Sequence, residues 1–148
     1  MWDESARAGF TDLLPPGHSF PEPDPERWFA LLEDPAVSLL VVEEDGELLG
    51  VSACGESRDD DVGASVGEVR SFFVAPGQWG RGVGRALMAG ALDSLRERGY
   101  AEATVWSFTA NERANAFYER LDFTRDGAEG PTDETWAGLP GIRYRRSL

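Results

Sequence analysis

The spacing of apolar and polar residues along the chain predicts alternating strands and helices. Two short apolar runs at 38–43 and 48–56 are separated by Asp45 and Gly46, a pair typical of a two-residue hairpin turn. A third run at 66–74 leads into a glycine-rich segment. After that segment, apolar residues recur every four positions, which is the spacing of a helix that packs one face against a core.

The rest of the pattern completes an α/β fold. Asp24 and Pro25 predict the start of a helix, because Asp caps helices and Pro fits their first position. The buried side of that helix is expected to consist of Trp28, Phe29, Leu31 and Leu32. The other expected elements are helices at 3–13, 83–98 and 111–120, strands at 101–106, 122–125 and 142–146, and loops at 14–23, 58–64 and 126–141. Strands 66–74 and 101–106 are joined through a helix and should run parallel. We expect a single domain spanning residues 1–148, with a mixed central sheet of about six strands and helices on both faces.

Length, charge and cysteine content narrow the class of protein. A chain of 148 residues is long enough for one domain with a buried core. The formal net charge of −13, from 27 acidic and 14 basic residues, argues against nucleic acid or an anionic membrane as a partner. The same charge would attract a cationic amine, or it serves solubility alone. A single Cys54, with no visible signal peptide and no apolar run of membrane-spanning length, predicts a cytoplasmic protein.

The glycine-rich segment is the strongest candidate for a ligand site. Gly77, Gly80, Gly82 and Gly84 keep side chains away from the backbone, and the helix that follows begins with unpaired N–H groups and the positive end of its dipole. Such a turn suits a phosphate or diphosphate group. The chain contains no lysine, which excludes a Walker loop, and the glycine spacing does not match the dinucleotide-binding pattern.

Two segments together resemble the signatures of the GNAT-type N-acetyltransferase superfamily. Residues 68–76 resemble its central strand, and residues 79–87 resemble its acyl-CoA loop, Gln/Arg-x-x-Gly-x-Gly/Ala, with Trp79 at the Gln/Arg position. Residues 111–123 resemble its second motif, Asn-x-x-Ala-x-x-x-Tyr-Glu-x-x-Gly-Phe, with Asp122 in place of the usual glycine. Asp tolerates a left-handed backbone, so the turn should be kept. The motifs follow each other in the family's order.

The resemblance implies a ternary complex in which a primary amine of a small molecule or peptide attacks the thioester of acetyl-CoA directly. The parallel strands 66–74 and 101–106 should splay to admit the pantetheine arm. Asn111 is expected to contact that arm or to cap its own helix, and one role does not exclude the other. The residues expected to contact acetyl-CoA are Phe72, Phe73, Val74, Trp79, Gly80, Arg81, Gly82, Val83, Gly84, Arg85, Asn111 and Tyr118.

Two side chains are expected to take part in proton transfer. Tyr118, at the family's tyrosine position, is the expected proton donor to the departing thiolate, although helical spacing alone would make it a core aromatic residue. Glu68 is the expected general base, acting through a water. Its alternative role is an ion pair with Arg70, which strand alternation places on the same face, together with Phe72 and Val74. Strand N–H groups near Val74 are candidates to stabilise the oxyanion.

No metal site is expected from the sequence. The sequence has one histidine, His18, and one cysteine, Cys54. It therefore offers few of the side chains that a Cys/His zinc site or a Ser/His/Asp triad requires. Three adjacent carboxylates at Asp59, Asp60 and Asp61 are interpreted as a solvated loop.

Two questions stay open at this point. The sequence begins within what resembles the family's first helix, so the family's first strand is either absent or supplied by another chain, and an exposed sheet edge would allow a homodimer. A non-catalytic acyl-CoA-binding sensor with the same fold is the alternative to an enzyme, and Tyr118 and Glu68 favour the enzyme. The amine itself is undetermined, because its pocket should lie within 10–36 and 126–141.

Overall fold

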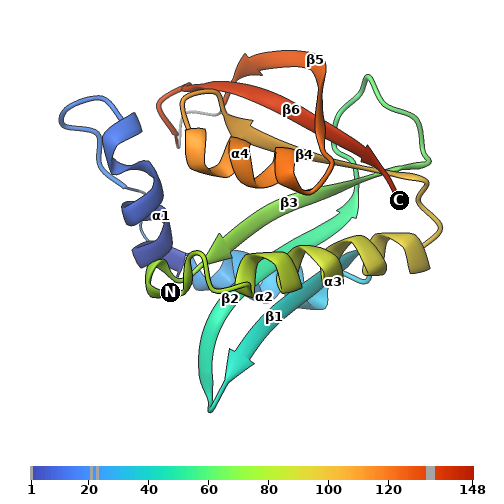
Figure 1. Cartoon of the computed structure of the whole chain (residues 1–148), viewed down its shortest axis with the longest axis horizontal. Coiled ribbons are helices and arrows are strands. Elements are labelled where there is room, and N and C mark those ends of the chain that lie inside the picture. The colour runs from blue at the N-terminus through green and yellow to red at the C-terminus, as the bar shows by residue number, and fades with distance from the viewer. Residues whose placement is uncertain (1, 21, 23, 133–135) are drawn as a thin grey trace.

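The computed structural model describes residues 2–20, 22, 24–132 and 136–148 and shows a mixed α/β fold (Figure 1). Its strands are β1 (Val37–Glu44), β2 (Glu47–Glu56), β3 (Val66–Val74), β4 (Glu102–Phe108), β5 (Thr124–Pro131) and β6 (Pro140–Ser147). Its α-helices are α1 (Trp2–Phe10), α2 (Pro25–Glu33), α3 (Val83–Glu97) and α4 (Glu112–Arg120), with 3-10 turns at Thr11–Leu13 and Pro76–Gln78. The strands form one sheet in the order β1-β2-β3-β4-β6-β5, with β3 and β4 parallel. The predicted fold class is confirmed, while the expected loops at 14–23 and 126–141 fall partly outside the described residues.

The helices are distributed unevenly over the sheet. Helices α3 and α4 lie on one face, α2 lies behind β1 on the other, and α1 sits where β3 ends (Figure 1). The core lies beneath α3 and α4 and consists of Cys54, Val69, Met88, Ala91, Leu92, Leu95, Ala103, Val105, Tyr118, Phe123, Ile142 and Tyr144. In the described ranges, no helix combines the length and apolar character needed to cross a membrane.

Local sequence chemistry sets several of the turns as predicted. Asp45 and Gly46 both have positive φ, at 52° and 81°, as the two-residue hairpin requires. The Asp24 carboxylate accepts the backbone N–H of Arg27 and caps α2. Asp122 takes φ 63°, so the turn that usually holds glycine is kept.

The predicted buried side of α2 is partly wrong. Phe29 and Leu32 are 64% and 61% exposed, while Trp28 and Leu31 are half-buried. This nine-residue helix packs mainly against β1 and has no fully buried residue. Apolar spacing therefore identified the helix correctly but overestimated how much of it the sheet covers.

The first half of the predicted loop at 126–141 is a strand. β5 was expected at 122–125 but runs over Thr124–Pro131, paired with β6 as far as its last residue. Its side chains are mostly exposed, and backbone hydrogen bonds to β6 hold it at the sheet edge. No apolar alternation marks such a strand, so the pattern of the sequence could not reveal it.

A β-bulge in β3 breaks the expected alternation of side chains. Val69 and Ser71 lie opposite consecutive residues of β2, so Arg70 is an extra residue between them. Val69 and Phe72 both pack against the core beneath α3 and α4, although they are three residues apart. Arg70 and Ser71 consequently fall on the opposite face, on which Glu68 also lies. The predicted regular alternation along the strand is therefore wrong.

The parallel strands separate beyond the bulge. β3 and β4 pair only over Val66–Val69 and Glu102–Val105, although both strands continue for several residues. The expected splay of the central strands is present, and it leaves backbone groups of β3 facing a gap.

The acidic loop between β2 and β3 is tethered, which corrects its interpretation as simply solvated. Arg143 of β6 is 3% exposed, and its guanidinium lies 2.7 Å from Asp61 and 3.1 Å from Asp59. Its Nε donates to Asp126 of β5 at 2.7 Å. The indole N–H of Trp106 donates to Asp59 as well. The loop is thus fixed to the sheet by a buried cation.

Candidate active site

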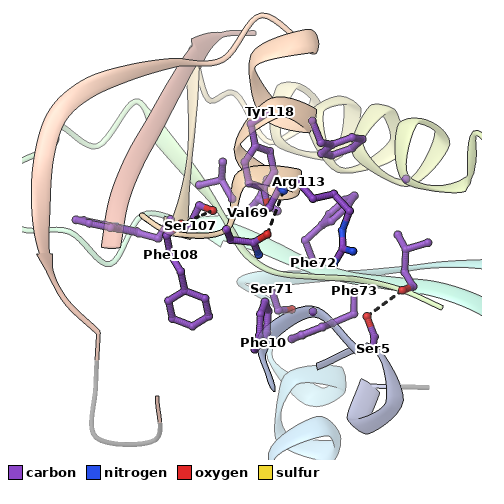
Figure 2. A pocket seen from close by; sticks show the side chains of 18 of the residues that line it. Ser5, Phe10, Val69, Ser71, Phe72, Phe73, Ser107, Phe108, Arg113 and Tyr118 are labelled. Atoms are coloured by element: carbon purple, nitrogen blue, oxygen red, sulfur yellow. Dashed lines mark hydrogen bonds between the residues drawn. The ribbon is translucent and has the colours of Figure 1, made fainter. Parts of the chain in front are cut away.

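A cavity of about 870 Å³ lies where β3 and β4 separate and is lined from both faces of the sheet. Figure 2 shows Tyr118 and Phe72 on the side of α4, and Ser71, Phe73 and Phe10 on the opposite side of the strand. The glycine loop borders the same cavity. A ligand held at the loop could therefore meet a second ligand that enters from the other face.

Most of the predicted contact residues line this cavity: Phe72, Phe73, Val74, Trp79, Gly80, Gly82, Gly84, Arg85, Asn111 and Tyr118. Three predicted site residues, Arg81, Val83 and Glu68, do not line it. The Val83 side chain points toward Gly50 of β2 instead.

The glycine loop has the geometry of an anion site. Gly80 and Gly82 have positive φ, at 76° and 89°, and a Cβ at either position would meet only open space. Gly82 is the N-cap of α3 and offers no side chain, so the first N–H groups of the helix have no capping partner. Arg85 adds a positive charge on the cavity wall. These features fit the diphosphate of a nucleotide-bearing cosubstrate.

Trp79, which stands at the family's Gln/Arg position, is fixed by two contacts. Its indole N–H donates to the carbonyl oxygen of Val74 at 3.0 Å. The guanidinium of Arg113 lies 3.5 Å from the centroid of its ring. Arg113 lines the cavity and pairs with no carboxylate in the described part of the chain. Helix α4 therefore supplies a cation, Arg113, next to the position where the family has Gln or Arg.

Tyr118 belongs both to the core and to the cavity wall. It is 6% exposed and its ring contacts those of Phe117, Phe123 and Tyr144. Burial, and to a lesser extent the nearby Tyr144 hydroxyl, raises the pKa of Tyr118 above the ordinary value for a phenol. The phenol therefore keeps its proton across the neutral range.

Glu68 is buried and bound to a different arginine from the one expected. It is 2% exposed, and its carboxylate accepts the Arg58 backbone N–H at 3.0 Å and the Arg58 guanidinium at 2.7 and 3.1 Å. Arg70 instead donates to the backbone carbonyl of Glu56, at 2.8 and 3.3 Å. The predicted Glu68–Arg70 pair is therefore absent, and Arg58 stands between Glu68 and the cavity.

Asn111 has the capping role predicted for it. Its side-chain oxygen accepts the Ala114 N–H at 3.2 Å, and the residue also lines the cavity. Asn115, one turn later, was not predicted. Its Nδ2 donates to the carbonyl of Thr109 at 3.0 Å, which ties α4 to the end of β4.

No individual residues were predicted from the sequence for the wall of the cavity opposite α3. Phe10, Phe108 and Trp136 form an edge-to-face cluster with ring centroids 5.0 to 5.7 Å apart. Arg58 and Arg70 also line this side. These residues come from separate segments and share no motif, so only the fold brings them together. In the part of the chain that the structure describes, no cluster of metal-ligating side chains occurs.

Comparison with known proteins identifies the family. A model of the acetyltransferase (GNAT) family matches residues 4–123. A mycothiol acetyltransferase from Cellulomonas flavigena is 36% identical over 120 residues, covering 78% of this chain and 33% of that protein. An uncharacterized N-acetyltransferase from Archaeoglobus fulgidus is 35% identical over 97 residues, 65% of this chain and 66% of that protein. The crystal structure of a PaiA N-acetyltransferase from Thermoplasma acidophilum in complex with coenzyme A superposes with a TM-score of 0.70 at 14% identity, over 98% of this chain and 87% of that one, which shows the fold.

The chain belongs to the acetyltransferase (GNAT) family. The predicted family is confirmed, and the acetyltransferases of that family use acetyl-CoA as cosubstrate. The chain spans about a third of the length of the mycothiol acetyltransferases that it matches.

Proposed function

We propose that this chain transfers the acetyl group of acetyl-CoA to a primary amine of a small molecule or peptide, by direct attack in a ternary complex. The observation that supports this most is the cavity between β3 and β4, which runs from the glycine loop on one face of the sheet to the opposite face. Acetyl-CoA held at the loop would extend its thioester into the gap, and the amine would approach from the opposite face.

The backbone of β3 offers donors for the oxyanion that forms during attack. The N–H of Ala75 points to β2, where it bonds to the carbonyl of Leu49 at 2.9 Å. Groups of the preceding residue, Val74, point the other way, into the gap left by β4. Its carbonyl there accepts the Ser5 hydroxyl at 2.9 Å, which fixes the end of the strand. This orientation supports the Val74 N–H as a donor to the oxyanion.

Tyr118 is proposed to stabilise the departing thiolate. Its buried phenol keeps its proton, and the residue lines the cavity. A CoA thiol has a pKa near that of a cysteine, about 8.5, so complete transfer from a phenol of raised pKa is unfavourable. Tyr118 would therefore act mainly by donating a hydrogen bond to sulfur as negative charge develops.

The proton of the amine is proposed to pass through water to the carboxylate of Glu68. An alkylamine with a pKa of about 10.4 is almost fully protonated at neutral pH, so a base is needed. Glu68 does not line the cavity itself, but its carboxylate binds the guanidinium of Arg58, which does. A water chain along this pair would carry the proton, with Arg58 holding the carboxylate in place.

Titration calorimetry with acetyl-CoA, followed by thiol-release assays over a panel of amines, tests the proposal. We expect binding at a single site and thiol release with at least one amine class. Binding without release on any amine would favour the alternative, a non-catalytic acyl-CoA sensor with the same fold. Absence of binding would contradict both.

A further inference from the structure

We infer that the acceptor is an amine that also bears a carboxylate, of the α-amino-acid type with a bulky apolar side chain. This inference rests on the proposed acetyl transfer and names its acceptor class. It derives from the charges and rings on the face of the cavity that lies opposite the glycine loop.

The cavity is cationic although the protein is strongly anionic. Among the residues that the structure describes, six basic side chains and one acidic side chain line it: Arg27, Arg58, Arg70, Arg85, Arg113, Arg120 and Asp59. That one carboxylate, of Asp59, is already bound by Trp106 and Arg143. A net charge of −13 would by itself favour a polycationic acceptor, but the charged side chains described along the cavity are mostly positive.

Arg70 is the central element of this arrangement. The bulge turns it onto the face of Glu68 and Ser71, immediately beyond Val69, where β3 and β4 begin to separate. Its guanidinium is anchored on the carbonyl of Glu56, a neutral acceptor, so its charge is not cancelled. Within the described residues no carboxylate forms an ion pair with Arg70. Because Nε and Nη2 both donate to that carbonyl, the Nη1–Nη2 edge of the guanidinium is the one left to bind a carboxylate with two parallel hydrogen bonds.

The phosphates of acetyl-CoA do not account for Arg70. The glycine loop and α3 lie on the other face of the sheet, where Val69 and Phe72 pack (Figures 1 and 2). Arg85 lies in α3, directly after the loop, and Arg113 of α4 stacks on Trp79 at the start of the loop. Arg70 is separated from them by the strand itself. Its charge therefore faces the acceptor.

The opposite end of the cleft is aromatic. Phe10, Phe108 and Trp136 meet edge to face and line the cavity near the ends of α1 and β4. Because β4 runs parallel to β3, this cluster lies at the wide end of the gap and Arg70 at the narrow end. An amino acid that places its carboxylate on Arg70 and its side chain among the rings holds its amine between them, beside the gap.

Three acceptors that differ only at the carboxylate test the inference. Phenylalanine has the acid, phenylalaninol has a neutral hydroxymethyl group in its place, and 2-phenylethylamine has hydrogen. We expect kcat/KM with saturating acetyl-CoA to be about 10- to 100-fold higher for phenylalanine than for either analogue, the range of a hydrogen-bonded charge pair, with most of the difference in KM. In Arg70→Gln this preference should collapse to within about threefold, whereas Arg96→Gln, an exposed arginine of α3 outside the cavity, should retain it.

A binding measurement separates this inference from the proposed chemistry. The CoA-saturated protein is titrated with N-acetylphenylalanine and with N-acetyl-2-phenylethylamine, and we expect the acid to bind at least 10-fold more tightly. If no amine is acetylated but this preference is seen, the proposed function fails and the assignment of the carboxylate site holds. Equal binding of the two, or equal turnover of acid and neutral acceptors, overturns the inference.

Discussion

Tyr118 shows how one side chain serves stability and chemistry together. Its ring contributes to the core through three aromatic neighbours, and its hydroxyl is the part that reaches the cavity. Substitution by phenylalanine removes the hydroxyl and leaves the packing nearly unchanged. The two roles can therefore be tested apart.

We predict that Tyr118→Phe lowers kcat by about 100-fold or more, as expected for loss of a positioned hydrogen-bond donor to developing negative charge, while the dissociation constant for CoA changes less than about threefold. Burial raises the pKa of Tyr118, so the wild-type rate should rise with pH as the amine loses its proton and show no decline up to about pH 10. Steady-state kinetics and calorimetry measure these quantities. An unchanged kcat would remove Tyr118 from the mechanism.

Arg113 replaces, in space, the polar side chain that the family holds at position 79. We predict that Arg113→Gln weakens CoA binding by about 10-fold, because a cation stacked on Trp79 beside the glycine loop is lost. The deficit should shrink at high salt, where the charge of the wild-type residue is screened. Calorimetry at two ionic strengths measures both effects, with Arg96→Gln as the control. Equal affinities would show that Arg113 does not face the phosphates.

At the scale of elements, the turn from β3 into α3 depends on residues without side chains. Gly82 caps α3 with φ 89°, and no neighbouring atom lies within 4 Å of the position of its missing Cβ. The space is open, so a side chain there would obstruct the diphosphate that we propose to bind at this loop.

We predict that Gly82→Glu abolishes measurable CoA binding, because it places bulk and negative charge at the helix N-terminus. Gly17→Glu is the matched control: Gly17 also has positive φ, at 83°, with open space around it, and it does not line the cavity. Both variants bear the same backbone strain and charge, so only the first should lose CoA. Retained binding in Gly82→Glu would contradict the assignment of the loop.

At the scale of the whole molecule, Arg143 joins three segments. Asp59 and Asp61 come from the loop after β2 and Asp126 from β5, and all three contact a guanidinium that is almost fully buried. These carboxylates, Asp61 first among them, raise the pKa of Arg143. The network holds the loop that presents Arg58 to the cavity.

We predict that Arg143→Met lowers the free energy of unfolding by about 3 to 5 kcal/mol, because partly buried carboxylates lose their cation.

Burial opposes the charge of Asp126, but the Ala128 N–H and Arg143 outweigh it and lower the pKa of Asp126. A lowered pKa contributes stability above the unfolded value of about 3.9 that is lost as pH falls below it. Denaturant unfolding between pH 3 and 7 should therefore show a steeper acid loss for wild type than for Arg143→Met. Arg145→Met, at a more exposed arginine that also contacts Asp126, should cost less than about 1 kcal/mol.

Several features followed from the sequence because they depend on neighbouring residues. The Asp45-Gly46 hairpin, the Asp24 cap, the glycine loop and the left-handed Asp122 each involve only a few consecutive positions, whose backbone preferences act locally. Apolar periodicity located the strands of the core and the helix α3. The two motifs and their order identified the family.

Other features required the tertiary structure because they depend on residues far apart in the chain. The bulge at Arg70 arises from pairing with β2 and reverses the face of each residue that follows, which no local pattern encodes. The partner of Glu68 is Arg58 because the fold brings the loop back over the strand. The sequence by itself thus determined the fold class and predicted which loop binds acetyl-CoA. The cationic, aromatic-ended cleft proposed for the acceptor was decided by packing, since its walls come from segments that meet only when the sheet has formed.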